Sequence, residues 1–346
     1  MDYELVSLFC GAGGLDYGFQ QAGFRTVLAL DNCPDAVRTF NWNSKHQIAC
    51  EADLSRLSPD DFLALVPSTA SPVGLIGGPP CQGFSRGNAH ADSNDPRNRL
   101  PFRYASLLAA ANRKYELHFF VFENVTALAG QKHANRFSSI LAKFRAAGFN
   151  LFQSELNASD FAVPQRRRRL FVVGLHRDIY KNVLFEFPEG LGNYRTVLDA
   201  ISGLPQPCFF SRSLSPSDVP YHPNHWTMVP RSSKFNSSGS ANGRSFRRLK
   251  WNDSSPTVAY GNREVHVHPD GGRRLSVLEA MLLQGFPRQY QITGTLSSQI
   301  TQVSNAVPPP VAQAIAVRIK SLLDLQPRLP LKAEAVTNEG LAGQVK

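Results

Sequence analysis

Short apolar segments alternate with amphipathic segments through the first half of the 346-residue chain. Segments such as 5–9, 27–30 and 118–122 are four or five residues long and mostly apolar, which is typical of buried strands. Between them, segments such as Pro34–Asn43 place apolar residues at helical spacing. Because strands that alternate with helices build a parallel sheet with helices on both faces, we predict an α/β fold with a doubly wound, mostly parallel sheet.

The remaining elements of this half follow the same two patterns. Helices are predicted at 15–22, 104–114 and 134–147, and strands at 48–50, 73–76, 152–157 and 169–174. We expect the last two strands to pair as a hairpin.

The periodicity is lost at about Tyr194, where Pro, Ser, Asn and Gly dominate, and it returns at about Leu275 with helical patterns at 275–284 and 311–323. This change predicts a small module inserted into the main α/β domain. The expected divisions are a main domain at 1–190, the module at 191–272, a return to the main domain at 273–324 and a tail at 325–346.

Composition is that of an ordinary soluble protein, with 42% hydrophobic and 18% charged residues. No apolar stretch approaches the roughly 20 residues that span a membrane, and the acidic start does not resemble a signal peptide, so we expect no membrane association. The five cysteines are odd in number and form no CxxC pair. We therefore expect a reducing compartment, no disulfide framework and no metal site.

The net charge of +10 favours a polyanionic partner, although solubility alone can account for a basic balance. The charge is concentrated in the small module, where residues 211–250 hold seven basic side chains against one acid, Asp218. This segment is also rich in Ser, Asn, Gly and His. It suits phosphate binding better than it suits a core.

Phe9, Gly11 and Gly13 lie in a turn between the first strand and the first helix, and Asp31 ends the second strand. Glycines in such a turn allow a ligand to approach the backbone, and a carboxylate there can accept hydrogen bonds from ribose. The dinucleotide fingerprint G-x-G-x-x-G is broken by Asp16, which favours a ligand without pyrophosphate, such as S-adenosylmethionine. A tight turn with no ligand is an equal alternative, and an NAD-dependent oxidoreductase is a weaker one.

Cys81 follows Pro79 and Pro80 at the end of an apolar run and precedes a polar, glycine-rich segment. Most unpaired cysteines are small buried hydrophobes. The two prolines fix the backbone here, however, and nearby arginines favour the thiolate. Cys81 is therefore a candidate nucleophile.

Glu123 ends the predicted strand 118–122, at the edge where α/β sheets bind ligands. Burial there would raise its pKa and let it donate a proton, whereas a helix cap or loop acid is the plain alternative.

Four consecutive arginines, at positions 166–169, lead into the last predicted strand of this half. Strand alternation places Arg167 and Arg169 on one face and Arg166 and Arg168 on the other. One pair can then serve an active site while the other meets solvent or phosphate.

Taken in order, these motifs resemble those of the prokaryotic DNA (cytosine-5)-methyltransferase family. The resemblance runs from residue 5 to about 318, and it departs from the family at Ser304, where glycine is usual. The motifs are Phe9-x-Gly11-x-Gly13, Pro79-Pro80-Cys81-Gln82, Glu123-Asn124-Val125, Gln165-x-Arg167-x-Arg169, Arg274-Leu275-Ser276-x-x-Glu279 with Leu283-Gln284-Gly285-Phe286-Pro287, and Ser304-Asn305-Ala306-Val307-Pro308-Pro309. It implies a Rossmann-like methyltransferase fold with an inserted target-recognition domain.

For catalysis, the resemblance implies that Cys81 adds to C6 of a cytosine and makes C5 nucleophilic. Glu123 would contact N3 and the exocyclic amine, and Arg169 the base carbonyl with support from Arg167. C5 then takes a methyl group from S-adenosylmethionine. The base must be flipped out of the duplex, because these atoms cannot be reached inside it.

The resemblance also implies a cofactor pocket and a surface for double-stranded DNA. The S-adenosylmethionine pocket would consist of Phe9, Gly11, Gly13, Asp31, Asp53, Pro80, Leu100, Asn305 and Val307. DNA contacts are expected from Ser85, Arg86, Arg231, Arg244 and Arg247. His222, His225, Trp226 and Asn236 either read bases or fold the module, and folding is the better expectation for each.

Two other functions stay open. One is a transfer-RNA cytosine-5 methyltransferase, although the Cys-Phe-Thr triplet common in that branch is absent. The other is a non-catalytic DNA-binding relative, against which the intact Cys81, Glu123 and Arg169 argue. The compact chain looks prokaryotic, so we expect a cytoplasmic, nucleoid-associated monomer whose role fits restriction-modification with a cognate endonuclease.

Overall fold

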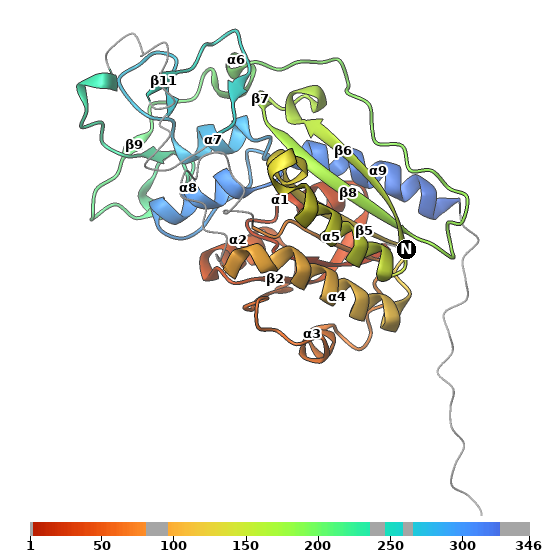
Figure 1. Ribbon diagram of the computed structural model, residues 1–346. Coiled ribbons are helices and arrows are strands. Elements are labelled where there is room, and N and C mark those ends of the chain that lie inside the picture. The colour runs from red at the N-terminus through yellow and green to blue at the C-terminus, as the bar shows by residue number, and fades with distance from the viewer. Residues whose placement is uncertain (1–2, 81–95, 236–245, 259–265, 326–346) are drawn as a thin grey trace, which may run out of the picture.

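The computed structural model describes residues 3–80, 96–235, 246–258 and 266–325. They form two lobes (Figure 1), a larger one built on the central sheet and a smaller one that carries β9, β11, α6, α7 and α8. No described helix is long and apolar enough to cross a lipid bilayer.

The large lobe is built on a seven-stranded sheet of order β3-β2-β1-β4-β5-β8-β6. Only β8 runs against its neighbours, so the predicted doubly wound, mostly parallel sheet is confirmed. The strands are β1 (Tyr3–Leu8), β2 (Phe24–Asp31), β3 (Ala49–Glu51), β4 (Gly74–Gly77), β5 (Phe119–Val125), β6 (Phe149–Asn157) and β8 (Arg168–His176).

The predicted hairpin is confirmed as the antiparallel pair of β6 and β8. β8 also pairs antiparallel with β5, with Val125 opposite Arg169 and Glu123 opposite Phe171. Because β8 runs backwards, its first residues lie at the carboxyl end of β5. This is how Glu123 and Arg169, which are far apart in the chain, meet at one edge of the sheet.

Helices cover both faces of the sheet. The helices of the large lobe are α1 (Gly14–Gln21), α2 (Pro34–Asn43), α3 (Pro59–Leu65), α4 (Leu100–Tyr115), α5 (Ala134–Ala146) and α9 (Pro309–Asp324). α4 and α5 pack aromatic residues such as Tyr104 and Phe144 onto one face. α1 and α9 share the core of the other face, where a Cβ at Gly18 would lie only 2.4 Å from that of Ala312. The chain thus returns to the first domain through α9.

The small lobe is held by side chains rather than by an extended sheet. Its helices are α6 (Val197–Ile201), α7 (Val277–Leu283) and α8 (Leu296–Asn305), and its two-residue strands are β9 (Cys208–Phe209), β10 (Trp226–Thr227), β11 (Arg247–Arg248) and β13 (His266–Val267). Trp226, Val258, Met281 and Val303 share one buried core. α7 and α8 therefore pack with residues 191–272, and the predicted domain limits stay a prediction.

A short strand pair joins the two lobes, since β7 (Gln165–Arg166) runs parallel to β12 (Ser255–Pro256). Single turns of 3-10 helix complete the described elements at Pro96–Arg99, Thr126–Ala129, Gln131–His133, Ala158–Phe161, Pro216–Asp218 and Ser233–Phe235. Sequence periodicity missed α3, α6 and α8. The first two are single short helices that are marked by caps, with Ser58 accepting from Asp61 and a capping box between Thr196 and Asp199.

Candidate active site

The centre of the site is an ion pair at the carboxyl end of β5. Nε of Arg169 lies 3.1 Å from Oε1 of Glu123, and the Glu123 residue is only 8% exposed. Burial raises the pKa of the Glu123 carboxyl, while the guanidinium groups of Arg169 and Arg167 oppose that rise. The result is a buried acid held in place by arginine, a pairing that the sequence did not predict.

The four arginines separate as strand alternation predicts. Arg167 is 2% exposed and Arg169 half-buried on the Glu123 side, whereas Arg166 and Arg168 are exposed. Arg166 forms two hydrogen bonds with Asp253 of the small lobe, at 2.9 and 3.3 Å. Nε of the buried Arg167 has no hydrogen-bond partner among the described residues. Burial lowers the Arg167 pKa, and an unpaired donor there is available to a substrate or to a neighbouring segment.

Cys81, the predicted nucleophile, lies outside the described residues, but the stem that leads to it is described. The carbonyl of Pro79 accepts a hydrogen bond of 3.1 Å from Nδ2 of Asn124, the residue after Glu123. A Cβ at Gly78 would lie 2.7 Å from Oε2 of Glu123, so only glycine fits where the stem passes the Glu123 side chain. The stem is thus fastened next to the Glu123 carboxylate.

The predicted cofactor turn is bound to the second strand. Oδ2 of Asp31 accepts from the backbone N–H of Gly11 at 2.9 Å, and Oδ1 accepts from that of Cys33 at 2.9 Å. Burial raises the Asp31 pKa. Phe9, Gly11 and Gly13 all have positive φ, and a Cβ at Gly11 would meet no atom within 4 Å. The turn therefore presents bare backbone to open space, which suits a bound ligand.

Asp16, which breaks the dinucleotide fingerprint, is a structural residue beneath this turn. It accepts hydrogen bonds from the hydroxyls of Ser7, at 2.8 Å, and Thr26, at 3.0 Å. It joins α1 to β1 and β2 without contacting any described cation, and burial raises its pKa to about 6.

The other predicted cofactor residues border the same turn or its edge. Val307 is buried, and a Cβ at Gly14 would lie 2.3 Å from its carbonyl, so the segment that follows α8 lies against the glycine turn. Asn305 is exposed at the end of α8, and Leu100 is buried at the start of α4. Asp53 is exposed and Pro80 ends the described stem. Their contacts with a cofactor stay predictions.

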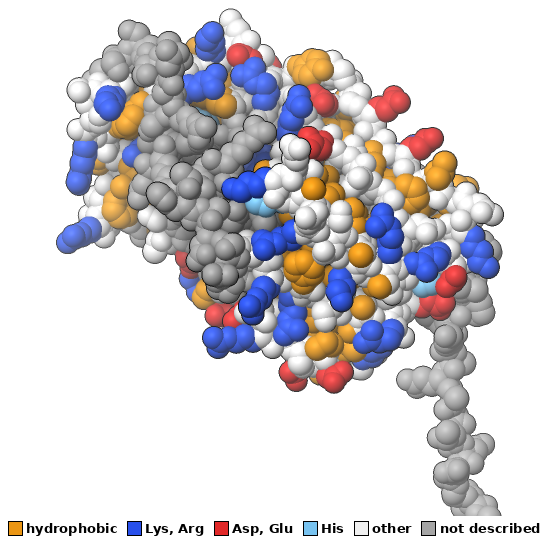
Figure 2. Space-filling view, viewed as in Figure 1, with side chains coloured by type: hydrophobic (Ala, Val, Ile, Leu, Met, Phe, Trp, Pro, Cys, Tyr) orange, Lys and Arg blue, Asp and Glu red, His pale blue; other side chains and the backbone are white. Residues whose placement is uncertain are grey.

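The small lobe carries the predicted basic surface. Figure 2 shows Lys and Arg side chains over its visible face, with few acidic side chains among them. Arg231 and Arg247 are exposed, as are the other described basic residues of 211–250. Ser85, Arg86 and Arg244 lie outside the described residues.

The buried polar residues of the module point inward and fold it. His225 contacts the Ser276 hydroxyl at 3.0 Å, and Trp226 donates from Nε1 to Oε1 of Gln299 at 2.8 Å. His222 is buried and accepts from the backbone of Asn224 at 3.1 Å. Asn236 lies outside the described residues. For the three described residues, the folding role is confirmed.

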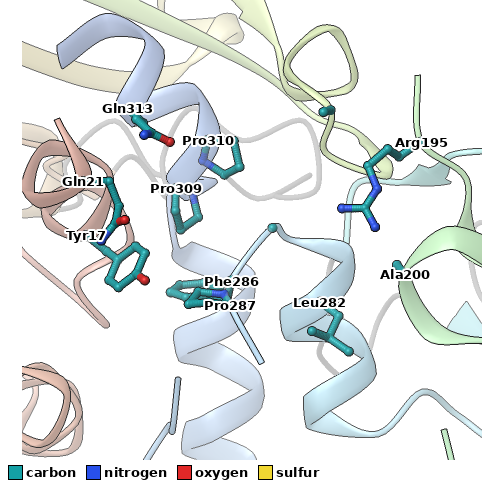
Figure 3. Close-up of a pocket in the computed structure, with 12 residues that line it drawn as sticks. Tyr17, Gln21, Arg195, Ala200, Leu282, Phe286, Pro287, Pro309, Pro310 and Gln313 are labelled. Carbon is teal, nitrogen blue, oxygen red and sulfur yellow. The ribbon is translucent and has the colours of Figure 1, made fainter. Parts of the chain in front are cut away.

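A groove of about 350 Å³ lies away from these residues, between α1, α9 and the end of α7. Figure 3 shows Tyr17 and Gln21 of α1 on one side and Arg195 on the other, with Phe286 and Pro287 between them. None of the predicted catalytic or cofactor residues lines this groove. It is therefore not the candidate active site.

The described cysteines at 10, 33, 50 and 208 carry free thiols. Within the described ranges, no group of three or more His, Cys, Asp or Glu side chains is placed to hold a metal ion.

Comparison with known proteins bears on the whole chain. The family model described as C-5 cytosine-specific DNA methylase matches residues 3–321. The chain is 33% identical to Type II methyltransferase M.MthTI of Methanothermobacter thermautotrophicus, over 94% of this chain and 99% of that protein. It is 29% identical to Type II methyltransferase M.NgoPII of Neisseria gonorrhoeae, over 93% and 96% of the two chains.

Solved structures agree on the fold. A prophage-encoded DNA modification methyltransferase of E. coli superposes with a TM-score of 0.76 at 23% identity, covering 93% of this chain and all of that one. The S. pombe Dnmt2 methyltransferase gives a TM-score of 0.62 at 20% identity, covering 93% and 99%.

Proposed function

The chain belongs to the C-5 cytosine-specific DNA methylase family, and we propose that it methylates C5 of a flipped cytosine in duplex DNA through a covalent bond between Cys81 and C6. The observation that carries this proposal is the buried Glu123–Arg169 pair beside the fastened stem of Cys81. Nucleophile, acid and orienting cation then share one edge of the sheet, where α/β folds bind ligands.

Cys81 supplies the thiolate that bonds to C6, and the electron pair of the C5–C6 double bond makes C5 nucleophilic. The Asn124 hydrogen bond to Pro79 supports this role, because it fixes the residue two positions before the sulfur. Once C5 is methylated, loss of the C5 proton and cleavage of the S–C6 bond restore the aromatic ring.

Glu123 contacts N3 and the exocyclic amine of the cytosine and stabilises the charge that develops at N3. Burial raises the pKa of its carboxyl, which makes proton donation to N3 easier than it would be for an exposed glutamate. Arg169 orients the carboxyl and presents its remaining N–H groups to the base carbonyl. Arg167, buried behind them with an unpaired Nε, supports the pair and would complete its hydrogen bonds when the site is filled.

S-adenosylmethionine, the methyl donor of this family, fits the turn that follows β1. The donor has no pyrophosphate, and the turn accordingly lacks a third glycine while leaving open space at Gly11. Asp31 retains lone pairs for ribose hydroxyls beyond the two backbone bonds that it accepts. Phe9, Gly13, Asp53, Pro80, Leu100, Asn305 and Val307 complete the proposed pocket. When bound, the cofactor supplies an electrophilic methyl group to C5.

Duplex DNA is the substrate of this family, and the module at 191–272 is the proposed reader of the target sequence. Its exposed cations, Arg231 and Arg247 among them, suit phosphate contacts that position the duplex. Ser85 and Arg86, which follow Cys81, and Arg244 are further proposed contacts. We place the catalytic and cofactor functions in 1–190 and 273–324, with 325–346 as a tail.

The Type II relatives support a role in restriction-modification, in which a cognate endonuclease would cut the same site when it is unmethylated. We propose that the enzyme acts as a monomer on DNA in the cytoplasm of a prokaryotic cell, at the nucleoid. A monomer suffices because every proposed catalytic group comes from one chain.

The test is methyl transfer in vitro. Purified protein is mixed with labelled S-adenosylmethionine and either mixed-sequence duplex DNA or transfer RNA, and the nucleosides are separated after digestion. We expect label in 5-methyldeoxycytidine and none in the RNA. Label in transfer RNA alone would support the RNA methyltransferase alternative, and no 5-methyldeoxycytidine from any DNA would overturn the proposal.

A further inference from the structure

Two glutamine side chains form a buried hydrogen-bonded chain between the arginine run and the cofactor segment. Oε1 of Gln165 accepts from the backbone N–H of Val258 at 3.1 Å, and its Nε2 donates to Oε1 of Gln284 at 2.6 Å. Nε2 of Gln284 then donates to the carbonyl of Ala306. Neither glutamine has any exposed surface. We call these two side chains the glutamine relay.

The relay has a direction that only amides can supply. Each glutamine accepts with its oxygen and donates with its nitrogen, so a carboxylate at either position would lack the donor that the next link requires. Nε2 of Gln165 also donates to the carbonyl of Leu283 at 3.2 Å, which fastens the end of α7 to the same point. Losing any one of these hydrogen bonds would leave a buried polar group without a partner, which costs free energy. The positions of both amide side chains are therefore tightly fixed.

Both ends of the relay are attached to proposed functional segments. Gln165 is two residues from Arg167, and its backbone pairs with Ser255 in the strand contact between the lobes. Ala306 lies between Asn305 and Val307 of the proposed cofactor pocket. The Val307 carbonyl packs closely against the backbone at Gly14. The relay therefore links the base side of the site, the cofactor side and the small lobe.

The backbone next to the relay is closely packed at Gly285, which lines the groove. Gly285, directly after Gln284, has a φ of +83°, and a Cβ there would lie 2.9 Å from Cδ of Pro310 and 3.3 Å from Cγ2 of Val163. Only glycine satisfies both the backbone angle and this approach. Gly285 and Pro310 both line the groove, whereas Gln165 and Gln284 do not and are fully buried.

We propose that Gln165 and Gln284 are positioning residues that hold the cofactor segment at 305–307 in register with the arginine run. This inference rests on the proposed function, because that function makes both segments parts of one site. Breaking the relay would let the cofactor segment shift relative to Arg167 and Arg169. Cofactor affinity and turnover would then fall together, while the lobes remain folded.

The test measures cofactor affinity and turnover separately in the full-length protein. Gln284→Glu keeps the acceptor for Gln165 but loses the donor to Ala306, and Gln165→Glu loses the donor to Gln284. The matched control is Gln299→Glu, since Gln299 is equally buried and its Nε2 donates to the Gly294 carbonyl within the small lobe. Calorimetry gives the Kd for S-adenosylmethionine, thermal denaturation gives Tm, and single-turnover kinetics give the methylation rate.

We expect Gln284→Glu to raise the cofactor Kd about tenfold, which corresponds to about 1.4 kcal/mol, and to slow methylation. Gln299→Glu should lower Tm without changing that Kd. If Gln284→Glu does not fold, Gln284→Met and Gln165→Met serve, and their double variant should cost less than the sum of the single changes. A Gln284 variant that loses Tm like the Gln299 control but keeps the wild-type Kd would overturn the inference. A wild-type protein that neither binds the cofactor nor methylates DNA would instead refute the proposed function.

Discussion

Arg169 reaches Glu123 across the antiparallel pairing of β8 and β5, with Nε 3.1 Å from Oε1. The two residues are brought together by the one strand of the central sheet that runs against the others. A parallel β8 would place its arginines at the opposite edge of the sheet, away from Glu123 and from the described stem at Gly78–Pro79. The position of the proposed chemistry is therefore set by strand direction as much as by the motif residues.

The substitution Arg169→Lys tests the role of the Glu123–Arg169 pair. Arg169→Lys keeps the charge but loses the planar fork that can bond Glu123 and a base carbonyl together. We expect the single-turnover methylation rate to fall by about 100-fold, the usual cost of one positioned donor. Arg168→Lys is the control, because the neighbouring Arg168 is exposed and faces away. Equal rates for the two variants would contradict the role of Arg169.

Asp16 gives the protein a pH-dependent stability. Its folded pKa is about 6, above the ordinary value of 3.8, so the folded state favours the protonated carboxyl. The corresponding stability is fully present below about pH 4 and is lost as pH rises through 6. Asp16→Asn removes this titration and retains a neutral polar group between Ser7 and Thr26.

The measurement is denaturant unfolding of wild type and Asp16→Asn from pH 4 to pH 7.5. All other groups titrate alike in the two proteins, so the difference between them isolates Asp16. We expect this difference to move in favour of the Asn variant by about 2.5 kcal/mol across the range, because the folded pKa of about 6 lies above the ordinary 3.8. A constant difference over that range would contradict a raised pKa for the buried Asp16 carboxyl.

Asn224 should hold the small lobe together. Its Nδ2 donates to the carbonyl of Ile292 at 2.7 Å and its Oδ1 accepts from the N–H of Ile292 at 2.9 Å, with no exposed surface. Asn224→Ala leaves both backbone groups buried without partners, so we expect a loss of roughly 3 kcal/mol in the free energy of unfolding. Asn193→Ala, at an exposed position, should change stability by less than about 0.5 kcal/mol. Similar stabilities for the two variants would show that the Asn224 bonds contribute little.

The basic surface predicts a salt-dependent affinity for DNA. Arg247→Ala should weaken binding to all duplex sequences by a similar factor if Arg247 contacts phosphate, and it should reduce the slope of log affinity against log salt by about 1. Arg113→Ala, at the end of α4, removes an equal charge from the large lobe and should leave that slope unchanged. Fluorescence anisotropy over a range of salt concentrations distinguishes the two. A weakening confined to particular sequences would instead assign Arg247 to base reading.

Much of the large lobe could be predicted because central strands such as β4 and β5 are apolar on both faces. A run such as 118–122 can be recognised as a buried strand from its own residues alone. Glu123 could be identified as a candidate site residue because it is the charged residue at the end of that run. The faces on which the four arginines lie could also be predicted, because side chains in a strand alternate between its two faces.

The small lobe resisted prediction because polar residues form much of its interior. α8 buries Gln299 and Gln302, so its apolar residues alone form too thin a stripe to mark a helix. Gln165 and Gln284 each belong to a recognised motif, but nothing in the sequence pairs them across 119 positions. Such contacts follow from tertiary packing, and no local pattern encodes them.

The central claim is that this chain makes 5-methylcytosine in DNA through Cys81. The most direct measurement is base-resolution sequencing of 5-methylcytosine in DNA from cells that express wild type, Cys81→Ser or Cys50→Ser, the last removing an exposed thiol outside the site. We predict methylation at one defined sequence with wild type and with Cys50→Ser, and none with Cys81→Ser at equal protein levels. Wild-type methylation by the Cys81 variant would contradict the claim.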